Sequence, residues 1–136
     1  MIIRQTYPEL TANHIKPLKA DLQIGAKDSI AKYNDSRKEI TFTNGSTILF
    51  GYCANDRDLD RYQGTEVDIQ FVDEACNFSE HQLKVLSACV RGTNGYPKRI
   101  YYPCNPSGQG MGYIKRVFID RKYEEGENPD DYEFIQ

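Results

Sequence analysis

The spacing of apolar residues along the chain predicts alternating strands and helices. Short runs with aliphatic or aromatic residues indicate strands at residues 2–6, 67–72 and 98–102. Leu83, Leu86 and Val90 recur instead at helical spacing, behind a capping box that begins at Ser79. Residues 111–119 also have the pattern of an amphipathic helix, with aromatic and aliphatic positions on one side.

A β-hairpin is the clearest local prediction. Residues 40–43 and 47–50 are rich in Ile, Thr and Phe and flank the dipeptide Asn44-Gly45. Asn-Gly favours the positive φ angles of a type I′ turn, so we expect a two-residue turn here.

The first helix is expected to begin at Thr6. Thr6 and Glu9 have the spacing of a capping box, and Pro8 suits the first turn. The helix should run toward Ile15, where Pro17 is expected to break or kink it. A second helical piece should then end near Gly25.

The predicted order is strand, helix, hairpin, strand, helix, strand, helix. Strands that alternate with helices indicate an α/β fold with a mostly parallel sheet and helices on both faces. In such sheets, sites form at the carboxyl ends of the strands. Two predicted strands end in polar residues there: Asp73-Glu74 follows one, and Asn105 follows another.

Composition excludes several classes of protein. The chain has 136 residues, is 39% hydrophobic and carries 17 Lys+Arg against 20 Asp+Glu, so one folded domain is expected and a strongly basic DNA-coating domain is not. No apolar run reaches the length of roughly 20 residues that spans a membrane, and the first residues lack a secretory signal. The four cysteines lack zinc-site spacing and are expected to be reduced thiols.

Asp73 and Glu74 have the pattern of the strand half of a nucleotide-hydrolase site. The first carboxylate would hold Mg²⁺, which prefers oxygen ligands, and the second would orient and deprotonate a water. The alternative is a strand that ends in two solvated acids before a helix. The two residues alone favour the second interpretation.

Asn105 and Arg61 are two further candidates. The Asn105 amide could hydrogen-bond a water or a phosphate at the same edge of the sheet, although Asn105-Pro106 could also be a simple turn. Arg61 could neutralise transition-state charge at a neighbouring nucleotide, or it could be a solvated arginine among the acids of residues 55–64.

Several of these segments occur in an order that matches a known family. They are Arg4-Gln5-Thr6-Tyr7-Pro8, the hairpin of residues 40–50, Leu59-Asp60-Arg61-Tyr62-Gln63-Gly64, Phe71-Val72-Asp73-Glu74-Ala75, Cys104-Asn105-Pro106 and the aromatic helix around Tyr113 and Phe118. In this order and spacing, the chain up to about Asp120 resembles the large terminase subunit of tailed bacteriophages and prophages, in the group common in Gram-positive hosts.

The resemblance implies a P-loop NTPase-like ATPase that pumps viral DNA into a capsid. By that similarity Asp73 matches the Walker B residue that holds Mg²⁺, Glu74 the catalytic glutamate and Asn105 the coupling motif that also contacts the nucleotide. Arg61 lies where some relatives place an arginine that acts on a neighbouring subunit. The implied cofactors are ATP and Mg²⁺. The implied partners are double-stranded viral DNA, the portal protein and the small terminase subunit, in the cytoplasm of the bacterial host.

The main departure from the family is the phosphate-binding loop. No G-x-x-x-x-G-K-[ST] run occurs, and the run from Gly108 to Gly112 lacks the Lys-Ser/Thr ending. We therefore expect an interior piece of a longer protein: residues 1–123 as a partial ATPase domain without the P-loop strand, and residues 124–136 as an acidic linker toward a nuclease domain. Such a piece should not hydrolyse ATP alone. Its unpaired edge at Ile100 to Tyr102 should favour self-association, or another segment of the chain should cover that edge.

Two other functions stay open. The chain could be a non-enzymatic prophage remnant that serves as an interaction module. It could also be a metal-dependent nuclease that uses Asp56, Asp58, Asp73 and Glu74, although Arg57 and Arg61 alternate with the acids of that loop.

Overall fold

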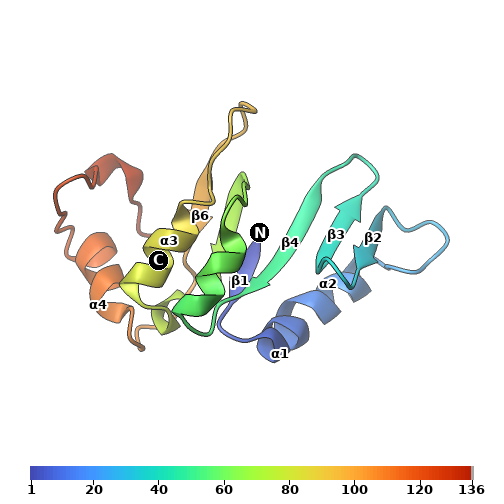
Figure 1. The fold of residues 1–136 in the computed structure, drawn as a ribbon, viewed down its shortest axis with the longest axis horizontal. Helices are drawn as coiled ribbons and strands as arrows, with labels where there is room; N and C mark the ends of the chain where they lie inside the picture. Colours follow the sequence, from blue (N-terminus) through green and yellow to red (C-terminus); the bar gives the residue numbers. More distant parts are fainter. Residues whose placement is uncertain (136) are drawn as a thin grey trace.

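A six-stranded sheet forms the centre of the molecule (Figure 1). The structure, a computed structural model, describes residues 1–135. The strands are β1 (Ile2–Arg4), β2 (Ala31–Asn34), β3 (Glu39–Phe42), β4 (Thr47–Tyr52), β5 (Ile69–Val72) and β6 (Arg99–Tyr101). The helices are α1 (Tyr7–Leu10), η1 (Thr11–Ile15), α2 (Lys16–Asp21), η2 (Asp56–Tyr62), η3 (Ala75–Asn77), α3 (Glu80–Ser87), α4 (Met111–Ile114), η4 (Lys115–Ile119) and η5 (Pro129–Asp131).

The sheet is mostly parallel, as predicted, in the order β2-β3-β4-β1-β5-β6. Strand β1 pairs in parallel with β4 and β5, and β5 pairs in parallel with β6. Strand β2 was not predicted. It extends the hairpin into an antiparallel meander, because it pairs with β3 over its whole length.

Helices cover both faces of the sheet. Ile2 and Ile3 are neighbours in β1 and therefore point to opposite faces. Ile2 packs against the cluster under α1 and α2, whereas Ile3 belongs to the cluster under η2 and α3. The predicted α/β architecture is thus confirmed.

The hairpin turn differs from the prediction. Gly45, with φ of 85°, is the one residue of the turn at positive φ, so the turn is not type I′. The Gly45 N–H donates to Phe42 O (3.0 Å), and the Phe42 N–H donates to Ser46 O (2.9 Å). This is a three-residue loop that closes on a glycine in the left-handed region, the next most common hairpin geometry.

The first helical region continues past Pro17 without a break, which was one of the two predicted outcomes. Helix α1 begins after Thr6, whose hydroxyl bonds to the Glu9 carboxylate (2.8 Å) rather than to the backbone. The π-helix η1 then leads directly into α2. Its wider turn accommodates a proline ring that would clash with the carbonyl four residues back in an α-helix.

The capping box of α3 is confirmed. The Gln82 N–H donates to Ser79 Oγ (3.2 Å), and the Ser79 N–H donates to Gln82 Oε1 (2.9 Å). Leu83 and Leu86 are buried, but the helix ends at Ser87, so Val90 lies beyond it and forms a bridge with Val67. The predicted helix over residues 111–119 is confirmed as α4 followed by η4.

The segment after η4 folds back onto the helices. The Arg116 guanidinium pairs with Glu127 (2.7 Å), and the Tyr132 ring packs against Phe118 and Tyr123. The acidic segment therefore has fixed contacts within residues 1–135, while its function as a linker stays a prediction. Over the same residues, none of the helices is long and apolar enough to cross a membrane, and all four cysteines are free thiols.

Candidate functional site

The carboxyl ends of β1, β5 and β6 meet at one edge of the sheet. The Asp73 N–H donates to Ile3 O (2.9 Å), which joins the residue after β5 to β1. The Ala75 N–H donates to Pro103 O (3.2 Å), which joins the next turn to the segment after β6. The predicted convergence of these strand ends is therefore present in the backbone.

Asp73 is held by neighbours from three segments. Its Oδ2 atom lies 2.9 Å from Arg4 Nε, at the end of β1, and 2.7 Å from His14 Nε2, in η1. Its Oδ1 atom accepts a hydrogen bond from the Glu74 N–H (3.0 Å). A carboxylate offers about four lone-pair sites, so Oδ1 keeps one available.

Glu74 lies beside Asp73 in a strained backbone conformation. Its φ of 55° and ψ of 46° are left-handed, which is uncommon for a residue with a side chain. Strain of this kind costs of order 1–3 kcal/mol and is concentrated at functional sites. The Glu74 carboxylate is 35% exposed and lies 3.7 Å from Arg4 Nη2, so Arg4 contacts both acids.

Asn105 lies in the loop after β6 and is exposed. Its carbonyl oxygen accepts from the Ser107 N–H (2.7 Å). Within residues 1–135 its side-chain amide makes no hydrogen bond to Asp73 or Glu74. The structure thus brings the loop to the acids, but it does not join the amide to them.

Gly108 and Gly110, two glycines of the run from Gly108 to Gly112, bring that loop against η3. A Cβ added at Gly108 would clash with Cys76 O, and one added at Gly110 would clash with Phe78 O. The Gly110 N–H donates to Cys76 O (2.8 Å). These glycines therefore serve close backbone packing beside the acids rather than a phosphate-binding loop.

Arg61 lies farther along the same edge, in η2 after β4. Its Nη2 atom is 2.8 Å from Asp58 Oδ1, and its guanidinium lies over the Tyr52 ring at 4.4 Å. It lines an open pocket of about 470 Å³ that also includes Tyr7 and Lys38. Arg61 therefore lies two strands away from Asp73, with its own set of contacts.

Sequence reasoning missed Arg4 and His14 as parts of the site. Arg4 contributed only to the family pattern, and His14 is separated from Asp73 by 59 positions. Helical periodicity across residues 7–21 would not predict the contact, because a π-helical segment sets the direction of His14.

The Asp73 and Glu74 carboxylates suit a hard cation such as Mg²⁺. Both are oxygen donors, both are partly exposed, and Oδ1 of Asp73 has an available lone pair. We therefore regard this pair as the residues that would hold the ion.

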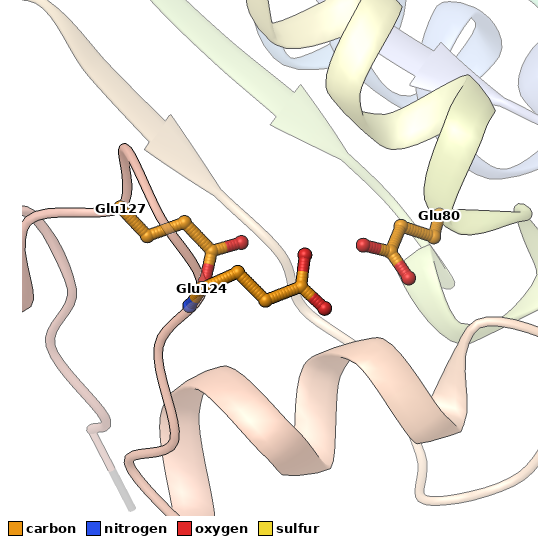
Figure 2. Close-up of side chains that lie close together, drawn as sticks. All are labelled: Glu80, Glu124 and Glu127. Atoms are coloured by element: carbon orange, nitrogen blue, oxygen red, sulfur yellow. The ribbon is translucent and has the colours of Figure 1, made fainter.

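A second group of acids does not suit a cation. Glu80, Glu124 and Glu127 bring three carboxylates within 4.8 Å of one another (Figure 2). Lys84 and Arg116 each lie within 4.0 Å of all three acids, so every one of these carboxylates already has two cationic partners. This cluster attaches the C-terminal segment to α3 and η4.

The fold is an α/β sheet in which two adjacent acids follow β5, so the candidate site lies at the carboxyl edge, where sheets of this class bind their ligands. The chain belongs to the phage terminase large subunit family, whose model matches residues 1–136. The large terminase of a thermophilic bacteriophage is similar in structure, with a TM-score of 0.61 and 25% sequence identity over 89% of this chain. The matched part is 30% of the length of that terminase chain. A comparison with curated proteins gave no match.

Proposed function

We propose that residues 1–123 are part of the ATPase domain of a terminase large subunit, which drives ATP-dependent packaging of viral DNA. The family match and the structural likeness to a large terminase support this proposal. The observation that carries it is the placement of Asp73 and Glu74 together at the end of β5, beside the loop that follows β6. In this proposal the fold is P-loop NTPase-like without the P-loop strand, which would pair with the far edge of β6.

Asp73 and Glu74 have different roles in the proposed site. Asp73 would hold Mg²⁺ through its Oδ1 side, and the ion would offset negative charge on the ATP phosphates. Glu74 would accept a proton from the attacking water, since its carboxylate is partly exposed beside Asp73. The left-handed backbone of Glu74 sets the direction in which its side chain leaves the main chain.

Asn105 and Arg61 have supporting roles. The Asn105 loop packs on η3, which follows Glu74 directly in the chain. A movement of either segment would therefore displace the other. Arg61 would act on a nucleotide of a neighbouring subunit, because it lies at the same edge but two strands from Asp73. Viral DNA, the portal protein, the small terminase subunit and further copies of the chain are the proposed partners, in the bacterial cytoplasm. Residues 124–136 would lead toward a nuclease domain.

A non-enzymatic interaction module is the second candidate. The 136 residues contain no phosphate-binding run, so we expect the isolated chain not to hydrolyse ATP. A nuclease built on Asp56 and Asp58 has less support. Asp58 is buried and already accepts hydrogen bonds from the Ala54 and Asn55 N–H groups as well as from Arg61.

ATP turnover by a complete subunit that contains this segment tests the proposal. Asp73→Asn should abolish turnover or shift it to much higher Mg²⁺ concentration, because the carboxylate proposed to hold Mg²⁺ is lost. Asp68→Asn is the matched control, since Asp68 precedes β5 at its other end and pairs with Lys98. Turnover with an unchanged Mg²⁺ dependence in Asp73→Asn would refute the proposed role, and absence of turnover in the unmodified subunit would favour the interaction module.

A further inference from the structure

We propose that His14 is a positioning residue for Asp73, which it holds so that the Oδ1 side of the carboxylate faces the nucleotide site. The proposal deepens the proposed function and rests on it for the role of Asp73. The contact itself does not depend on that function. His14 Nε2 lies 2.7 Å from Asp73 Oδ2, and the two side chains are only 25% and 23% exposed.

The π-helix explains why His14 reaches Asp73. Leu10 and Ile15 are both buried in the cluster under α1 and α2, although they are five residues apart. Five-residue spacing suits a π-turn, and the Lys16 N–H donates to Thr11 O, five residues back. In an α-helix, position 14 would lie on the same face as Leu10 and would point into the core. The π-turn gives that place to Ile15 and leaves His14 free to face Asp73.

Pro17 accounts for the π-turn. It occupies the first turn of α2, and in regular α geometry its ring would meet the carbonyl of Asn13. A wider turn avoids this clash without ending the helix. The proline that was expected to break or kink the helix supports the geometry that directs His14.

His14 adds a constraint that Arg4 alone does not provide. Arg4 contacts Asp73 Oδ2 and Glu74 Oε1 at once, so its guanidinium is shared between two acids. The imidazole approaches the same Oδ2 atom from η1, a different element. Both groups lie against Oδ2, one as an ion pair and one within hydrogen-bond distance, and a lone pair of Oδ1 stays available. Loss of His14 should therefore free the Asp73 side chain to rotate.

The test measures the Asp73 side-chain rotamer in the 136-residue chain by NMR scalar couplings. We expect one rotamer in the unmodified chain and averaged couplings in His14→Ala. His14→Gln should restore one rotamer in part, since its amide can donate to Oδ2. His81→Ala is the control, because His81 is exposed in α3.

Two outcomes would overturn the proposal. One is unchanged couplings in His14→Ala with an intact amide spectrum. If the alanine variant misfolds, the Asp73 couplings are compared between His14→Gln and His14→Asn instead. Equal couplings in these two would overturn the proposal, because the shorter amide should not reach Oδ2.

A second measurement separates this proposal from the proposed function. In a complete subunit, His14→Ala should raise the Mg²⁺ concentration for half-maximal ATP turnover about 10–100-fold, as loss of an outer-shell partner typically does. If Asp73→Asn abolishes turnover while His14→Ala changes neither the couplings nor the Mg²⁺ dependence, the positioning role of His14 is refuted and the proposed function stands. If Asp73→Asn has no effect, the proposed function fails, and the NMR result still decides whether His14 fixes Asp73.

Discussion

The Nε atom of Arg4 lies 2.9 Å from Oδ2 of Asp73, so the last residue of β1 contacts the first residue after β5. The parallel pairing of β1 and β5 dictates this contact. Ile3 is opposite Val72, so the next residue of each strand reaches the edge at the same level. The side chain of Arg4 is 14% exposed, and it is the cation that offsets the adjacent carboxylates.

Arg4→Ala should destabilise the chain by about 1.5–3 kcal/mol, because a partly buried carboxylate loses a charged partner. Urea unfolding followed by circular dichroism measures the change. Arg37→Ala is the control, since Arg37 is 73% exposed and forms a surface pair with Glu39. That variant should change stability by at most about 1 kcal/mol. Equal effects of the two substitutions would contradict a structural role for Arg4.

Gly110→Ala should also destabilise the chain, here through a steric clash. An added Cβ would overlap Phe78 O, and relief of such overpacking costs about 1–3 kcal/mol. Gly112→Ala is the matched control, because no atom lies within 4 Å of its added Cβ and it is inside α4. Alanine there should raise stability by about 0.5–1 kcal/mol. Thermal unfolding of the two variants should therefore shift in opposite directions.

Local patterns predicted most of the fold. The alternation of strands and helices, the capping box at Ser79 and the hairpin around Gly45 all depend on residues close in sequence. Strand β2 was missed because its four residues are half polar and become a strand only through pairing with β3. The π-turn was missed for a related reason: Pro17 predicts a clash, but the clash can be relieved by breaking the helix or by widening it.

The candidate site was predictable only in part. Asp73, Glu74 and Asn105 each follow a recognisable strand, so topology places them at one edge. The contact of Asp73 with His14 depends on the direction of one side chain in a distant helix. No periodicity in the sequence encodes that direction.

The C-terminal segment should detach in acid. Arg116, followed by the Glu124 N–H, lowers the pKa of Glu127 to about 2 from an ordinary value of 4.5. The folded-state pKa is depressed, so the stabilisation is complete above pH 4.5 and is lost as pH falls toward about 2. Fluorescence of Tyr123 and Tyr132 should report the loss of their packing. Glu127→Gln should remove this acid transition, and an unchanged transition in that variant would contradict its assignment to Glu127.

The chain should self-associate through the β6 edge. Strand β6 is the last strand of the sheet in residues 1–135, and the face beside it carries the stacked rings of Phe71 and Tyr101. Phe71 is 41% exposed. A charge at such an edge opposes pairing, so Tyr101→Lys should shift the chain toward monomer in light scattering. Tyr96→Lys, at a 68% exposed loop position, should leave the distribution unchanged. A strictly monomeric unmodified chain would contradict this prediction.

ATP hydrolysis by a complete subunit with Glu74→Gln tests the proposed ATPase site most directly. Glutamine keeps the size of the side chain but cannot accept a proton from the attacking water. The account predicts that kcat falls about 10²–10⁴-fold while a fluorescent ATP analogue still binds. Glu66→Gln, which alters an exposed acid paired with Arg91 before β5, should leave kcat unchanged. A Glu74→Gln subunit that hydrolyses ATP at the unmodified rate would contradict the account.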